Sequence, residues 1–158
     1  MKSPEEVRRE LYEKWIRRAE EDLAVADQLL SDRVPYFGSI GFHSQQAAEK
    51  FLKAFLVWHQ IEFPKTHDLS KLLELVAQRD KSLSESLQGI LVLTVYGVDT
   101  RYPADLPDLT ENEATQAVEL ARQAKDQLLR TLFGSAPSQN LIGNRPSQQG
   151  ATPRFTAA

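Results

Sequence analysis

The chain has 158 residues, of which 41% are hydrophobic and 26% are charged, and it contains no cysteine. This size and composition predict a single globular domain, and the lack of cysteine excludes both a disulfide framework and a thiolate metal site. The formal net charge of -3 gives no overall attraction to phosphate backbones, so contact with nucleic acid would require a local basic patch.

The N-terminal sequence, MKSPEEVRREL, lacks the apolar core of a signal peptide. No run along the chain approaches the roughly 20 apolar residues that span a bilayer. The expected protein is therefore soluble and cytoplasmic, without a membrane contact.

The first predicted element is a helix from Ser3 to about Leu30. Ser3 can accept a hydrogen bond from a free backbone amide, Pro4 suits the first turn, and Glu6 can reach back to complete a capping box. Apolar residues at helical spacing should face the core: Tyr12, Trp15, Ala19, Leu23, Ala26 and Leu30.

A second helix, from about Tyr36 to His59, is predicted to be the central helix of the core. Its broad apolar face consists of Phe37, Ile40, Ala47, Phe51, Ala54, Phe55 and Trp58. A short third helix follows, with Thr66 or Asp68 as its cap. Its buried stripe consists of Leu69, Leu72, Leu73 and Val76.

A fourth helix is predicted from Ser82, with Glu85 completing an S-x-x-E capping box, to about Tyr96. The Pro- and Asp-rich stretch VDTRYPADLPDLTENE begins as a connecting loop, long enough to suggest a function. Thr110 and Glu113 form another capping box, and the last helix ends near Gly134. That helix carries Ala114, Ala117, Val118, Ala121, Ala124, Leu128, Leu129 and Phe133 on its apolar face.

These five helices and their short connections predict an all-α, antiparallel up-and-down bundle over residues 1–134. The remaining stretch, residues 135–158, is rich in Ser, Gln, Pro and Gly and has few apolar residues. We expect it to be a disordered tail.

One edge of the second helix carries polar residues three or four positions apart: His43, Gln46, Lys50 and Lys53. A cation and an amide beside a cleft suit phosphate or base recognition, and a histidine can act as a general acid or base. The simpler interpretation is the solvated flank of a core helix.

The stretch PKTHDLSKLLEL places His67 and Asp68 at a helix start. Capping is the simpler role for Asp68, because an acid there is favourable with the helix dipole, and the role of His67 is left open. The positions of His43, His59 and His67 match no compact metal-binding motif, so no metal site is expected.

Arg101 and Tyr102 stand in the loop segment TRYPADLPD. Arginine offers a planar fork for phosphate, and tyrosine a ring with a polar tip. Alternatively, Arg101 pairs with a nearby aspartate and Tyr102 packs on the bundle. The sequence contains no GxGxxG, GxxxxGK[ST] or GxSxG motif, and no cofactor is expected.

Three segments, in order, resemble the HEPN domain family (higher eukaryotes and prokaryotes nucleotide-binding): FHSQQAAEKFLKAFL, THDLSKLL and TRYPADLPDLTENEA. The resemblance covers roughly Trp15 to Phe133. It implies an antiparallel helical bundle that commonly forms a homodimer. Small prokaryotic members often accompany a minimal nucleotidyltransferase in two-component modules that behave as toxin and antitoxin.

Many HEPN toxins are metal-independent ribonucleases that use an arginine followed by four to six residues and a histidine. This sequence departs from that pattern, because no arginine stands at that spacing before any of its histidines. The resemblance therefore implies nucleotide or partner contact for the residues in the matching segments. These residues are His43, Gln46, Lys50, His67, Asp68, Arg101 and Tyr102.

Three functions follow as hypotheses. The first is a binding module, dimeric and partnered with a minimal nucleotidyltransferase, that contacts nucleotide or RNA. The alternative is a ribonuclease with a non-standard site in which Arg101 meets His43 or His67 in space, because acid–base chemistry needs proximity and not adjacency in sequence. The third is a purely structural helper of the nucleotidyltransferase.

Overall fold

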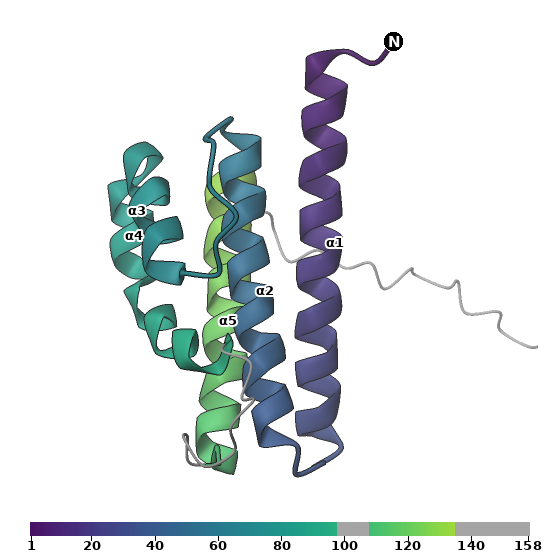
Figure 1. Ribbon diagram of the computed structural model, residues 1–158, viewed down its shortest axis with the longest axis vertical. Helices are drawn as coiled ribbons and strands as arrows, with labels where there is room; N and C mark the ends of the chain where they lie inside the picture. Colours follow the sequence, from purple (N-terminus) through teal and green to yellow (C-terminus); the bar gives the residue numbers. More distant parts are fainter. Residues whose placement is uncertain (98–107, 135–158) are drawn as a thin grey trace, which may run out of the picture.

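A computed structural model of the chain describes residues 1–97 and 108–134. These ranges form six helices and no strand (Figure 1), so the predicted all-α bundle is confirmed. The helices are α1 (Pro4–Ser31), α2 (Phe37–Trp58), α3 (Leu69–Arg79), α4 (Lys81–Ser86), the 3-10 helix η1 (Gln88–Gly97) and α5 (Glu111–Phe133). The predicted disordered tail lies outside the described residues, so the tail and the domain boundary at residue 134 stay predictions.

Helices α1 and α5 begin with the capping boxes that the sequence predicts. The Glu6 amide donates to Ser3 Oγ at 3.2 Å and the Glu6 carboxylate accepts from the Ser3 amide at 2.6 Å. Thr110 and Glu113 repeat this arrangement at the start of α5. These hydrogen bonds, from the cap backbone first and the cap side chain second, lower the pKa of both glutamates.

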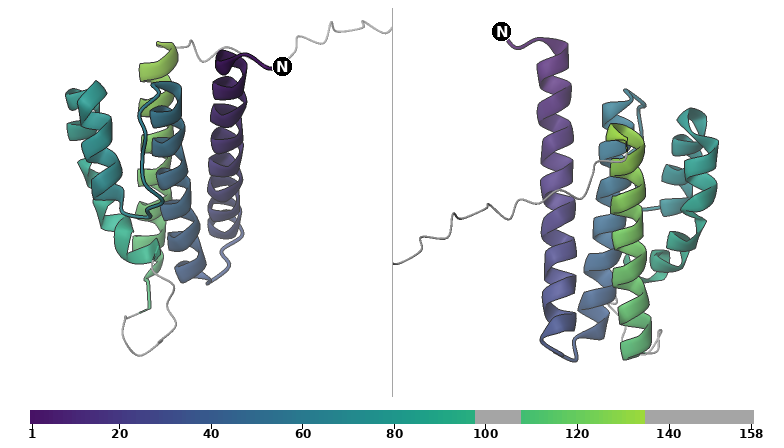
Figure 2. Two further views of the ribbon diagram at one scale, coloured as in Figure 1. Left: turned by 45° about the horizontal axis from the view of Figure 1, so that its top comes forward. Right: turned by 180° about the vertical axis from the view of Figure 1, so that it is seen from behind.

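The layers of the bundle place α2 at its centre. In Figures 1 and 2, α2 and α5 lie side by side, with α1 on one side and α3, α4 and η1 on the other. The large side chains of α2 that are at most 1% exposed are Ile40, Phe51, Leu52, Phe55 and Leu56, which confirms its predicted place in the core. No helix within the described ranges is both long and apolar enough to cross a membrane.

The aromatic contacts at one end of the bundle define the helix directions. Tyr12, near the start of α1, packs edge-on against Trp58 at the end of α2, and Trp58 packs against Phe133 at the end of α5. Thus α1 is antiparallel to α2, whereas α2 and α5 run in the same direction (Figure 1), so the predicted antiparallel arrangement holds for the first pair and not for the second. This is possible because α4 and η1 lead the chain back to the end of the bundle where α2 begins, and α5 starts from there. At the other end, Gly41 leaves room for Leu109, which precedes α5, because a Cβ at position 41 would lie 2.7 Å from Leu109 Cδ2.

The prediction of one helix from Ser82 to Tyr96 is wrong. The cap is Asp80, whose carboxylate accepts from the Leu83 amide at 2.9 Å, and the α-helix ends at Ser86. The chain continues as the 3-10 helix η1. Its β-branched residues have low α-helix propensity. Its inward side chains Ile90, Leu93 and Tyr96, together with Leu87 just before it, stand three residues apart. A repeat of three matches the three residues per turn of a 3-10 helix.

The buried phenol of Tyr12 leads to a prediction about alkaline pH. Burial, with smaller contributions from Glu20 and Glu13, raises the pKa of Tyr12 to about 12. An unfolded tyrosine ionises near pH 10, so the stabilisation from this protonated phenol is present below about pH 10 and is lost as pH rises through about 12. Ultraviolet difference titration should show this late transition in the native protein but not in Tyr12→Phe. Loss of the phenol proton of Tyr12 near pH 10 in the native protein would contradict the prediction.

Candidate functional site

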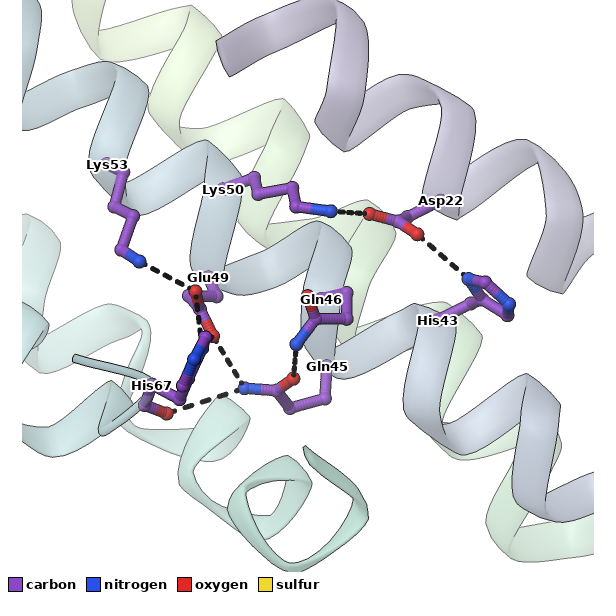
Figure 3. Close-up of polar contacts among 8 residues, drawn as sticks. All are labelled: Asp22, His43, Gln45, Gln46, Glu49, Lys50, Lys53 and His67. Atoms are coloured by element: carbon purple, nitrogen blue, oxygen red, sulfur yellow. Dashed lines mark hydrogen bonds and ion pairs between the residues drawn. The ribbon is translucent and has the colours of Figure 1, made fainter. Parts of the chain in front are cut away.

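Two polar clusters lie on different sides of α2 (Figure 3). The first faces α1 and joins Asp22, His43 and Lys50. The second faces the segment before α3 and joins Gln45, Glu49, Lys53 and His67. Gln46 lies beside the second cluster and donates from Nε2 to Gln45 Oε1 at 2.7 Å.

The first cluster is centred on the carboxylate of Asp22, whose side chain is 13% exposed. Asp22 Oδ1 lies 2.8 Å from His43 Nδ1, and Oδ2 pairs with the Lys50 ammonium. His43 and Lys50 therefore share one edge of α2, as their spacing predicts. Because Asp22 belongs to α1, this cluster also ties α1 to α2.

We expect Asp22→Ala to lower the free energy of unfolding by about 1–2 kcal/mol, because it removes two charge-assisted hydrogen bonds at a partly buried position. Chemical denaturation followed by circular dichroism measures this change. Asp126→Ala, on an exposed position of α5, is the matched control for the gain in helix propensity. Equal stability of the two variants would show that the Asp22 cluster contributes nothing to stability.

The second cluster is centred on the carboxylate of Glu49, whose side chain is only 2% exposed. Lys53 Nζ donates to Oε1 at 2.7 Å, and Gln45 Nε2 donates to Oε2 at 3.1 Å. His67 Nδ1 lies 3.1 Å from each oxygen. The charge of the buried carboxylate is thus balanced by a buried ammonium at Oε1, and Gln45 supplies a second donor from α2 at Oε2.

The Lys53 ammonium is enclosed by aromatic rings as well as by its ion pair. Its Nζ lies 5.3 Å from the centroid of the Trp15 ring and 5.9 Å from that of Phe63. The two rings pack edge-on, with centroids 6.2 Å apart. Rings that face a cation stabilise it where water is excluded. Lys53 therefore holds the Glu49 carboxylate in a fixed place.

The backbone around His67 is fixed by the start of α3. Asp68 is the N-cap, and its carboxylate accepts from the Ser70 amide at 2.9 Å, which confirms the capping role that the sequence predicts. Thr66 Oγ1 accepts from the Asp68 amide at 3.1 Å, and Gln45 Nε2 reaches the His67 carbonyl at 3.5 Å. The side chain of His67 is nevertheless 78% exposed. Its ring is thus held on one edge and open on the other.

The structure does not bring His43 and His67 into one site. No hydrogen bond or ion pair joins the two clusters within residues 1–97 and 108–134, and Figure 3 shows them on different sides of α2. Arg101 and Tyr102 lie outside the described residues. The last described residue before them, Gly97, packs on the Gln45 amide so closely that a Cβ would lie 2.5 Å from Gln45 Cδ.

Sequence reasoning missed three residues of these clusters: Asp22, Gln45 and Glu49. A signal for two of them was present, because Gln45, Glu49 and Lys53 recur every four residues on a helix whose neighbouring positions are apolar. Such a row points into the interior, where charges are paired. For Asp22 the sequence offers no comparable signal. Its position next to Leu23, in the apolar stripe of α1, does not indicate that its carboxylate has two partners on another helix.

Two shallow depressions on the described surface lie away from both clusters. One, of about 460 Å³, lies between α1 and the ends of α2 and α5, and it includes Arg8, Tyr12, Trp58 and Phe133. The other, of about 450 Å³, lies between α4 and α5. Within the described ranges, no three or more His, Asp or Glu side chains are grouped so as to hold a metal ion. The chemistry that the clusters offer is hydrogen bonding and proton transfer.

Comparison with known proteins places the chain in a family. The model of the HEPN domain matches residues 12–129, a range that contains both clusters and the predicted loop. Searches of curated proteins and of solved structures gave no significant match. The match covers most of the chain, and the helical bundle agrees with the fold that the resemblance implies. The chain therefore belongs to the HEPN domain family.

Proposed function

We propose that this HEPN protein is the helical component of a two-component, toxin–antitoxin-like module and works together with a minimal nucleotidyltransferase on nucleotide or RNA. The observation that carries the proposal is that the charged residues of the predicted polar edge of α2 (His43, Lys50 and Lys53) already have carboxylate partners. His43 and Lys50 pair with Asp22, and Lys53 pairs with Glu49. A chain that holds phosphate by itself needs cations directed at the ligand. The polar edge of α2 therefore supports recognition of nucleotide or RNA by the two proteins together, in which the partner supplies the phosphate contacts.

The proposed module contains a homodimer of the HEPN chain. Large hydrophobic side chains that are more than 40% exposed remain on α1 and η1, where a second copy or the partner can cover them. They are Val7, Leu11, Val25, Val92 and Val95. We expect light scattering of the purified chain to give the mass of a dimer.

Co-expression tests the proposed partnership. The chain is produced with an affinity tag together with an untagged minimal nucleotidyltransferase encoded next to it, and the purified material is analysed by size exclusion and for bound nucleotide or RNA. The expected result is a stable complex that retains more nucleotide or RNA than either protein alone. Failure of the two proteins to co-purify would count against the partnership, and the chain purified alone is the control.

A second candidate function is metal-independent cleavage of RNA, and the specific observation in its favour is the exposed His67 ring held by a buried carboxylate. This non-standard site would replace the absent arginine-to-histidine spacing. Cleavage of RNA in the presence of a chelator is compared for the wild type, Arg101→Ala and His43→Ala. Loss in either variant would assign that residue to the site, and equal cleavage by all three would exclude both.

A further inference from the structure

We propose that residues 140–143 of the chain dock into the depression between α1 and the ends of α2 and α5. Leu141 and Ile142 supply the apolar side chains, and the aromatic rings that line the depression receive them. The depression lies away from both polar clusters, so the inference stands independently of the proposed function.

The lining of the depression is aromatic and partly open to solvent. The rings of Trp58 and Phe133 pack edge-on with centroids 5.6 Å apart, and the Tyr12 ring lies 6.2 Å from that of Phe133. Phe133 is 54% exposed. Helix α1 extends beyond the end of α2 (Figure 1), and its residues 4–11 are exposed except for Arg8. A further segment can therefore cover apolar surface at this end of the bundle.

The charged side chains around the depression pair with one another. Arg9 Nε donates to Glu13 Oε1 at 3.2 Å, and Arg8 Nη2 lies 3.9 Å from Glu5 Oε1. The Arg8 guanidinium also lies over the Trp58 ring, 5.8 Å from its centroid. Because two arginines and two glutamates leave no net charge, an uncharged, apolar occupant suits the depression better than an anion or a cation.

The chain itself carries such an occupant close by. Residues 135–144, SAPSQNLIGN, contain no charged residue, and Leu141 and Ile142 are the only Leu, Ile, Val or Met between positions 135 and 158. Gly134 follows Phe133 directly and ends α5 with a φ of 73°, a conformation that favours glycine. Leu141 stands seven positions later, which allows a reach of up to about 24 Å from Gly134. Since Phe133 itself lines the depression, this reach is ample.

The short connection favours residues 140–143 of the same molecule over other occupants. A short linker gives an effective concentration on the order of millimolar, so modest apolar contacts are enough for docking. Phe155, the other large apolar residue after Gly134, stands much farther along the chain and directly follows Arg154. Docking of Phe155 would close a longer loop and bring a charge to a depression whose charges are already paired.

The test is NMR of the full chain with the δ1-methyl groups of isoleucine labelled with carbon-13. The chain has five isoleucines, and Ile142→Val identifies the signal of Ile142 by its disappearance. In the wild type, ring currents should shift this methyl signal upfield of its position in an unstructured chain. Nuclear Overhauser effects should connect the methyl group to ring protons of Trp58 and Phe133.

Paired substitutions separate docking of this segment from other causes of the shift. Phe133→Ser removes part of the aromatic lining and should return the Ile142 signal to the unstructured position, while the other four isoleucine signals report that the bundle is still folded. Phe155→Ser is the matched control, because it makes the same change outside the segment, and it should leave the Ile142 signal shifted.

Three outcomes would overturn the inference. The first is an Ile142 signal at the unstructured position in the wild type, and the second is a shifted signal that Phe133→Ser does not move. The third is a shift that disappears on dilution, with Overhauser effects only between differently labelled molecules in a mixture. That result would assign the contact to a second copy and exclude docking within one chain.

Discussion

Glu49→Ala lowers the free energy of unfolding by about 3–5 kcal/mol, the cost of removing one partner from a buried ion pair. The variant leaves the Lys53 ammonium, whose side chain is 7% exposed, without its carboxylate. It also removes the nearer of the two acceptors of the Gln45 amide, which is fully buried. Denaturant unfolding followed by circular dichroism measures the loss, which is a large fraction of the roughly 5–15 kcal/mol of a typical domain.

The Glu49→Leu/Lys53→Met variant is the control that separates charge from packing. Replacing a whole buried pair by apolar residues of similar size is often neutral or stabilising, so the double variant should be more stable than Glu49→Ala. If it is as unstable as the single variant, the loss comes from packing around α2 and not from an unpaired ammonium. If Glu49→Ala itself unfolds at the wild-type midpoint, the carboxylate is not a structural anchor.

Phe55→Ala should lower the free energy of unfolding by about 3–5 kcal/mol through the cavity it leaves. Phe55 is fully buried in α2 and contacts the ring of His59, with centroids 4.4 Å apart. Since α2 packs against both α1 and α5, neighbouring helices cannot close the space without moving away from other contacts. Thermal and denaturant unfolding both report this loss.

Phe42→Ala on the same helix is the matched control for Phe55→Ala. The side chain of Phe42 is 39% exposed, and its ring meets that of His43 at 5.4 Å. The same chemical change there removes much less buried surface, so the loss should stay below about 1 kcal/mol. Similar losses at both positions would contradict the assignment of α2 as the core helix with one solvent-exposed side.

The helices with strong local signals were predictable from sequence. The two capping boxes, at Ser3 and Thr110, and the broad apolar face of α2 all predicted what the structure shows. The second half of the predicted fourth helix was not predictable, because an apolar stripe that repeats every three or four residues is compatible with both an α-helix and a 3-10 helix. There the β-branched residues and the spacing of three between Leu87, Ile90, Leu93 and Tyr96 favour the 3-10 form.

The polar clusters were only half predictable. Spacing alone placed His43 and Lys50 on one edge of α2, but the carboxylate that joins them comes from α1, and a periodic pattern does not tell which helix a side chain will meet. The contact of His67 with Glu49 depends on the path of the chain between α2 and α3. Pairing across such distances is a property of the tertiary fold, and only the capping role of Asp68 was local enough to be predicted.

The shared direction of α2 and α5 has a consequence for how the chain folds. In a simple up-and-down bundle, each helix packs mainly on its neighbour in sequence, which keeps contact order low and folding fast. Here Gly41 must meet Leu109, and Trp58 must meet Phe133, across a long intervening stretch of chain. The entropy of closing that loop is lost before these contacts stabilise the product. The α1–α2 hairpin is therefore expected to form early, and docking of α5 to limit the folding rate.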